Sequence, residues 1–274
     1  MPLEYLWLIP LGFVIGAYGT LIGAGGGFVL VPILLLLYPQ ATTETITGIS
    51  LAVVFFNALS GSIAYARMKR IEYRSGLLFS AATIPGAILG ALATPYMPRR
   101  LFDGIFGLLL IAISIFLFIK PGGREEGEAA RPCPPNHRAC TVTEADGTVH
   151  RFSYHQPLGI VVSIAIGFFS SLLGIGGGII HVPVLIHLLN FPVHIATATS
   201  QFVLTNMALT GTLTHIATGA FTQGIRRTLL LAIGVLLGAQ LGARLSRKTP
   251  GAWIIRGLAF ALAAVGIRLL MMVF

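Results

Sequence analysis

The sequence predicts an all-α integral membrane protein built from two homologous repeats of about four helical segments each, with a small extramembrane β-hairpin inserted between them. Three observations support this fold class. Hydrophobic residues make up 55% of the chain and charged residues only 10%, far from the roughly 25% charged residues of a soluble domain. Long apolar runs recur along the whole chain, and the two halves share one glycine pattern.

Most of the apolar runs are near the roughly 20 residues that a helix needs to cross a hydrocarbon core about 30 Å thick. They cover residues 5–38, 46–66, 76–96, 101–119, 157–189, 196–218, 228–245 and 253–274. No Lys or Arg precedes Arg67, so the first run lacks the basic region of a cleavable signal peptide. We therefore expect a multi-pass membrane protein that keeps its first helix.

An internal duplication relates the two halves. GAYGTLIGAGGGFVLVP (residues 16–32) superposes without a gap on GFFSSLLGIGGGIIHVP (residues 167–183). The match continues with one or two single-residue gaps, which bring Ser50 onto Ser200, and PGAILGALA onto LGAQLGARL. The predicted organisation is a first transmembrane repeat over 1–120, a polar linker over 121–156 and a second transmembrane repeat over 157–274.

The first run, from residue 5 to residue 38, is too long for one straight crossing, because a single helix of that length would extend about 51 Å. A glycine cluster, Gly25 to Gly27, interrupts it, and Gly176 to Gly178 interrupts the second repeat at the matching place. Each glycine costs roughly 1 kcal/mol in a helix interior. We therefore expect a broken helix in each repeat.

Two interpretations of the breaks remain open. Glycines permit close helix packing, which is the role expected for Gly86-x-x-x-Gly90 and Gly238-x-x-x-Gly242. However, three consecutive glycines exceed what packing needs, and unwound backbone is tolerated in a membrane only where protein buries it or water reaches it. Free N–H groups and the positive dipole at the start of each second arm would suit an anion. Broken helices at matching positions of two repeats are typical of a transporter's substrate site.

Neutral polar side chains on the helix after each break can supply further hydrogen bonds to a small oxyanion, although the same residue types also serve helix packing. Positions 50 and 57, like 199 and 206, lie seven apart and share a helix face. His215 is a candidate ligand contact or proton carrier, or a structural histidine. The candidate substrate-binding residues are Gly25, Gly26, Gly27, Ser50, Asn57, Gly176, Gly177, Gly178, Thr199, Ser200, Gln201, Asn206 and His215.

The polar linker contains CTVTEADGTVHRFSYH, two β-prone runs around an Asp-Gly pair, which predicts a short hairpin. Cys133 and Cys140, with His137 and His150 nearby, can bind a metal, form a disulfide or stay free thiols. Their spacing does not match the usual zinc pattern. No metal site and no cofactor are predicted.

The net charge of +9 would suggest nucleic acid as a partner of a soluble chain. Here the basic residues fall mostly at the ends of apolar runs, which indicates orientation by the positive-inside rule. If each broken segment re-enters on the side where it began, the repeats are inverted; if it crosses, they are parallel. The two models differ by one basic charge, and the length of the first segment favours inverted repeats with the N-terminus outside.

The paired GxGGG segments ending in Val-Pro, the following helices with Gly61 and Gly211, and the later GAxxGA-type helices resemble the sulfite exporter TauE/SafE family of membrane permeases. The resemblance covers about residues 12–96 and 157–270. It implies export or exchange of small sulfur-containing anions, such as sulfite, sulfoacetate or other organosulfonates, across the bacterial inner membrane. It implies nothing about the polar insert.

The expected function is therefore secondary transport by alternating access around a midplane site. The alternatives are an anion channel with a dipole-lined pore and a permease for another small organic anion. A membrane enzyme is not expected, because the sequence has no H-E-x-x-H motif, no G-x-S-x-G motif and no clustered carboxylates. The expected partners are the anion and the lipid bilayer. Trp253 and the GxxxG surfaces serve either a homodimer or the internal fold alone.

Overall fold

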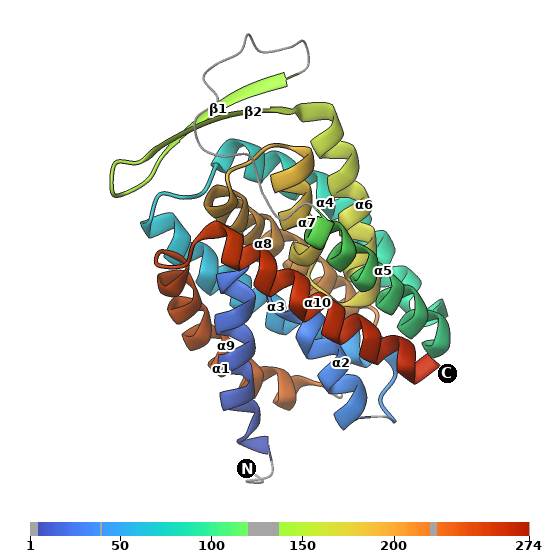
Figure 1. Cartoon of the computed structure of the whole chain (residues 1–274). Coiled ribbons are helices and arrows are strands. Elements are labelled where there is room, and N and C mark those ends of the chain that lie inside the picture. The colour runs from blue at the N-terminus through green and yellow to red at the C-terminus, as the bar shows by residue number, and fades with distance from the viewer. Residues whose placement is uncertain (1–4, 39, 120–136, 220–223, 274) are drawn as a thin grey trace.

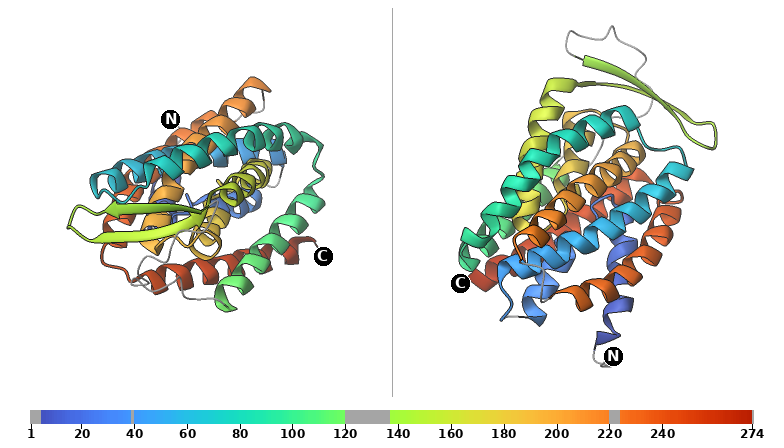
Figure 2. Two further views of the ribbon diagram at one scale, coloured as in Figure 1. Left: turned by 90° about the horizontal axis from the view of Figure 1, so that it is seen from above. Right: turned by 180° about the vertical axis from the view of Figure 1, so that it is seen from behind.

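The computed structural model describes residues 5–38, 40–119, 137–219 and 224–273. It is a bundle of tilted helices with a two-stranded sheet lying across one end, here called the hairpin end (Figures 1 and 2). In chain order the elements are α1 (Leu8–Leu21), α2 (Gly27–Leu37), α3 (Thr43–Arg67), α4 (Tyr73–Ala93), η2 (Thr94–Tyr96), α5 (Arg99–Ile119), β1 (His137–Thr143), β2 (Val149–His155), α6 (Gln156–Leu173), α7 (Gly178–Pro183), η3 (Val184–Leu188), α8 (Val193–Ala217), α9 (Ile225–Ser246) and α10 (Gly251–Val273).

Within the described residues, six helices are long and apolar enough to cross a membrane: α3, α4 with its 3-10 extension η2, α5, α6, α9 and α10. Helix α8 is also long, at 25 residues, but Thr, Ser, Gln and Asn recur along it and lower its hydropathy. The mostly helical membrane architecture and the small sheet agree with the sequence prediction.

Each interrupted segment forms two short helices joined by a glycine loop. Helix α1 runs from the N-terminal end of the bundle to its middle, and α2 returns toward that end (Figure 1). There the guanidinium carbon of Arg227, in α9, lies 3.6 Å from the ring centre of Tyr38, the residue that follows α2. Helix α6 starts instead at the hairpin end. Phe191, which follows η3, has returned to that end and packs against Phe152 of β2, with ring centroids 4.4 Å apart.

Glycines bring the long helices into backbone contact. Helix α1 packs along α9, and α6 packs along α4. A Cβ at Gly238 would collide with the Phe13 carbonyl of α1, and a Cβ at Gly86 would collide with the Ile164 carbonyl of α6. The prediction that these G-x-x-x-G segments serve close helix packing is confirmed.

Helices α3 and α8 pack against each other at the centre, whereas α5 and α10 pair at the outside. The most apolar stretch of α3 is 78% buried, compared with 39% for those of α5 and α10. Side chains on α3 and α8 are therefore the ones placed to face a buried site.

The hairpin is the predicted one. Strands β1 and β2 pair antiparallel, with Thr143 opposite Val149 beside the turn. The turn closes with a hydrogen bond from the Glu144 N–H to the Thr148 carbonyl, 2.9 Å long. Gly147 has a φ of 90° there, a conformation that favours glycine. Cys133 and the rest of the linker before residue 137 lie outside the described residues.

Candidate functional site

The two glycine loops, residues 22–26 and 174–177, are called here the first and second break. Gly26 and Gly177 are the N-caps of α2 and α7, with φ values of 80° and 68°. Glycine adopts this left-handed conformation without the steric cost that a Cβ would bring. Neither helix start has a side-chain cap, although the Gly178 N–H of α7 donates to the Gly176 carbonyl at 2.9 Å.

The two breaks touch each other at the centre of the molecule. A Cβ at Gly27 would lie 2.6 Å from the carbonyl oxygen of Ile175, and a Cβ at Gly178 would lie 2.5 Å from that of Gly23. Close packing therefore explains the glycine at these two positions. It does not explain the uncapped helix starts or the polar side chains around them.

Ser50 and Ser200 bind the breaks in a reciprocal way. The Ser50 hydroxyl, on α3, donates to the Gly174 carbonyl of the second break at 2.6 Å, and the Ser200 hydroxyl, on α8, donates to the Gly23 carbonyl of the first at 3.1 Å. Each serine satisfies a carbonyl that the end of a helix leaves exposed. Both therefore position the breaks.

Asn57 and Gln201 lie beside the end of α1, fully buried. Asn57 Oδ1 accepts from the Thr20 hydroxyl at 3.0 Å, and Gln201 Nε2 donates to the Gly19 carbonyl at 3.3 Å. The other half of each amide, Asn57 Nδ2 and Gln201 Oε1, has no partner within the described residues. The pair thus presents one unused donor and one unused acceptor in the protein interior.

Three further polar residues lie at the breaks and are not among the candidate substrate-binding residues predicted from the sequence: Thr47, Ser170 and Ser171. All three are fully buried, and their hydroxyls lack a partner in the described part of the chain. The Ser170 hydroxyl lies 3.0 Å from where a Cβ of Gly177 would be, so it sits directly at the start of α7. A signal was present, because the repeat alignment places Ser171 on Thr20.

The other predicted residues lie away from the breaks. The Thr199 hydroxyl accepts from the Glu72 N–H at 3.1 Å, and the Asn206 amide donates to the Ser80 hydroxyl at 3.2 Å. Both therefore face α4 and the loop before it. His215 is in the last turn of α8, fully buried, and neither ring nitrogen has a partner among the described residues.

No group of three or more His, Cys, Asp and Glu that could hold a metal occurs in the described ranges. Cys140 is a free thiol there. Burial, and to a smaller extent the negative charge of nearby Glu72, raise the pKa of this thiol to about 11. The pairing or metal binding of Cys133 is not addressed by the described residues.

Two uncapped, glycine-bounded helix starts face buried polar atoms that have no partner within the described residues. In a helical membrane bundle, this arrangement is typical of a transport protein. The chain matches the model of the sulfite exporter TauE/SafE family over residues 8–269, and it belongs to that family. It is a multi-pass membrane transporter.

Its relatives span nearly the same length. The chain is 33% identical to the probable membrane transporter protein YunE of Bacillus subtilis strain 168, over 98% of both chains. It is 26% identical to the probable membrane transporter protein MJ0441 of Methanocaldococcus jannaschii, over 89% of both chains, and 27% identical to the probable membrane transporter protein YdhB of Bacillus subtilis, over 89% of this chain. No solved structure matches the chain.

Proposed function

We propose that this chain is a secondary transporter of small sulfur-containing anions, such as sulfite, sulfoacetate or related organosulfonates, and that the substrate binds at the two breaks. One observation carries the proposal: buried polar atoms without partners in the described residues surround two uncapped helix starts. Each such orphan group costs roughly 1–3 kcal/mol, so a ligand that satisfies it gains affinity. The family to which the chain belongs makes sulfite the first anion to test.

The chemistry around the breaks suits an anion better than a cation. A helix start carries the equivalent of about half a positive charge, and serine hydroxyls and amide N–H groups donate to oxyanion lone pairs. Glu44 lies in the first turn of α3 and Asp103 lies near the start of α5, so these carboxylates are at helix ends. Fixed dipoles attract an anion without trapping it against a full counter-charge.

The contacts support an inverted-repeat arrangement. Exchanging the repeats turns α1 into α6 and α9 into α4, so the packing of α1 on α9 becomes that of α6 on α4. The bond from Ser50 to the Gly174 carbonyl likewise becomes the bond from Ser200 to the Gly23 carbonyl. Because α1 enters from one end of the bundle and α6 from the other (Figure 1), repeats related in this way have opposite orientations. Rocking one repeat against the other would expose the breaks to each side in turn.

The charge distribution favours a cytoplasmic hairpin end. The loop from Arg67 to Arg74 lies there against the hairpin turn, and the end of α9, followed by Arg247 and Lys248, contacts that loop through Ser246. This distribution fits the positive-inside rule. The N-terminus is then outside. Because the cell interior is negative, moving one negative charge outward gains about 2.3 kcal/mol per 100 mV. The membrane potential alone can drive export.

The test is thermal unfolding of the purified protein with sulfite, sulfoacetate, sulfate, acetate or chloride. A bound ligand raises Tm by mass action, so sulfite or an organosulfonate should stabilise the parent selectively. Ser170→Ala and Gly177→Leu should lose this gain. Ser62→Ala is the control, because its hydroxyl pairs with that of Thr205 at 3.2 Å, between α3 and α8. No shift with any anion, or an equal shift in all variants, would refute binding at the breaks.

A further inference from the structure

The hairpin joins both halves of the bundle at its end. The Ala145 N–H donates to the Met68 carbonyl, in the loop between α3 and α4, at 3.0 Å. The hydroxyl of Ser75, in α4, donates to the Tyr154 hydroxyl at 2.7 Å. On the other half, the Tyr154 ring packs against the Phe191 ring, with centroids 5.3 Å apart. The hairpin is therefore in contact with loops of both repeats.

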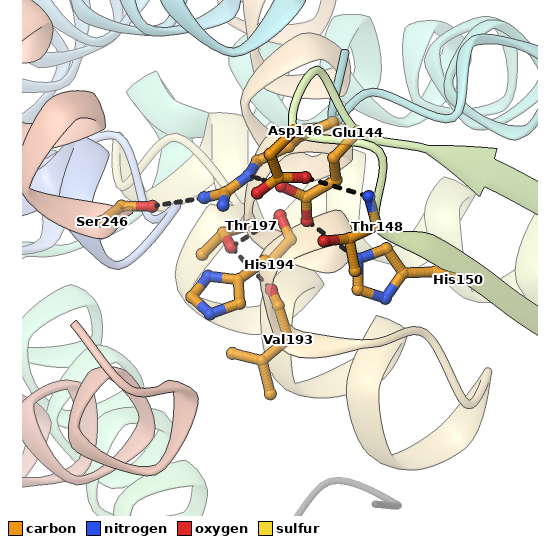
Figure 3. Close-up of polar contacts among 9 residues, drawn as sticks. Glu144, Asp146, Thr148, His150, Val193, His194, Thr197 and Ser246 are labelled. Carbon is orange, nitrogen blue, oxygen red and sulfur yellow. Dashed lines mark hydrogen bonds and ion pairs between the residues drawn. The ribbon is translucent and has the colours of Figure 1, made fainter. Parts of the chain in front are cut away.

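The Glu144 carboxylate is the centre of this junction. Arg70 Nε donates to Glu144 Oε2 at 2.6 Å. His150 Nε2 lies 2.8 Å from Glu144 Oε1 (Figure 3). Arg70 Nη1 also donates, at 3.5 Å, to the hydroxyl of Ser246, the last residue of α9. Arg70 and Glu144 are each only 6% exposed. Glu144 thus joins the hairpin to the α3–α4 loop, and Arg70 of that loop also contacts α9.

An ion pair of this kind suits a contact that opens and closes. A buried ion pair adds little net stability, since removing two charges from water offsets most of their attraction. If the hairpin lifts away, both charges return to water together. Removing one partner in the closed state is different, because the other charge stays buried without compensation. The pair therefore fixes one closed arrangement without making opening prohibitive.

The α3–α4 loop is also connected to the first break, through contacts with α8. Two residues after Arg70, the Glu72 N–H donates to the Thr199 hydroxyl at 3.1 Å. The next residue of α8, Ser200, donates to the Gly23 carbonyl at 3.1 Å. A short chain of contacts therefore runs from the hairpin to the break.

We propose that the hairpin is a latch that closes the hairpin end of the transport path, with the Glu144–Arg70 ion pair as its lock. Opening of this end separates the pair, lifts the turn from the Met68 carbonyl and frees the loop that contacts α8. The inference rests on the alternating-access function proposed above, and it gives the inserted hairpin a role in regulating that site.

The first test measures access to a buried reporter. In a background with Cys133→Ser and Cys140→Ser, Ala198→Cys places a thiol at a fully buried position that packs with Ile71 and Ala243. A membrane-impermeant maleimide, added from the hairpin side of proteoliposomes, reports opening of this end.

Glu144→Gln should raise the labelling rate at least about tenfold, because the lock is lost. Asp146→Asn is the matched control: it removes the same charge from an exposed residue of the same turn and should leave the rate unchanged. Should Glu144→Gln fail to fold, Arg70→Gln leaves the Glu144 carboxylate buried without its guanidinium partner and carries the same expectation. A folded lock variant that labels at the parent rate would overturn the latch.

A second test cross-links the hairpin to the α3–α4 loop. Met68→Cys with Ala145→Cys should form a disulfide that stops sulfite flux until a reductant is added. The control, Thr141→Cys with Arg151→Cys, joins opposite residues of β1 and β2 and should not change flux. Equal sulfite flux through the oxidised and the reduced forms of the Met68→Cys, Ala145→Cys protein would contradict the latch. If the parent protein itself carries no sulfite, the proposed substrate is wrong. The labelling experiment then still decides whether the hairpin acts as a latch.

Discussion

Gly27→Ala tests whether the two breaks are in direct backbone contact. The new Cβ would lie 2.6 Å from the Ile175 carbonyl oxygen, whereas real Cβ contacts stay beyond 3.0 Å. The breaks therefore have to separate by at least about 0.4 Å, and overpacking of this kind costs about 1–3 kcal/mol. Alanine recovers up to about 1 kcal/mol of helix propensity. The expected net loss in the free energy of unfolding is about 1–2 kcal/mol.

The assay is reversible unfolding in mixed micelles, with Gly257→Ala as the control. A Cβ at Gly257 in α10 meets its nearest heavy atom, the Tyr18 hydroxyl, at 3.7 Å, so this change should be neutral or stabilise by up to about 1 kcal/mol. Combining Gly27→Ala with Gly178→Ala should cost less than the sum of the two, because both push the same breaks apart. If Gly27→Ala is as stable as Gly257→Ala, the breaks do not meet as described.

Three further changes have defined outcomes. Asn57→Leu leaves the buried Thr20 hydroxyl without its acceptor, so it should lower the free energy of unfolding by about 1–3 kcal/mol. It should also abolish stabilisation by sulfite in thermal unfolding, and an unchanged sulfite response would exclude Asn57 from the site. Gly147→Ala meets no heavy atom within 4 Å but has to adopt a φ of 90°, so hydrogen exchange should show a hairpin weakened by about 1–2 kcal/mol, and unaltered exchange would contradict this. Since burial raises the pKa of Cys140 from the ordinary range of a thiol to about 11, the Cys133→Ser protein should react slowly with iodoacetamide at pH 7.5 and faster toward pH 11. Its raised pKa contributes stability below pH 9 that is lost as the pH rises through 11, and rapid alkylation of folded protein at pH 7.5 would refute the buried thiol.

The breaks and the hairpin could be predicted from the sequence because their signals are local. Glycine clusters mark the places where a helix cannot continue at low cost, and an Asp-Gly pair between β-prone runs marks a turn. The turn at Gly147 and the helix starts at Gly26 and Gly177 lie where these signals placed them.

The partners of the polar side chains could not be predicted in the same way. Helical periodicity correctly puts Thr199 and Asn206 on one face, but it does not say which helix that face meets, and both bond to the segment from Glu72 to Ser80. The repeat alignment was the better guide, since it pairs Ser50 with Ser200. Which hydroxyls lack partners depends on the tertiary packing, and no sequence spacing records it.

The most direct test of the account is counterflow in proteoliposomes. Vesicles preloaded with unlabelled sulfite are diluted into labelled sulfite, and entry of the label is followed in the parent and in Gly177→Leu. An alternating-access carrier that binds at the breaks predicts faster entry into preloaded vesicles for the parent and no acceleration for the variant. Entry that follows the membrane potential and ignores preloading would indicate a channel, and it would contradict the mechanism proposed here.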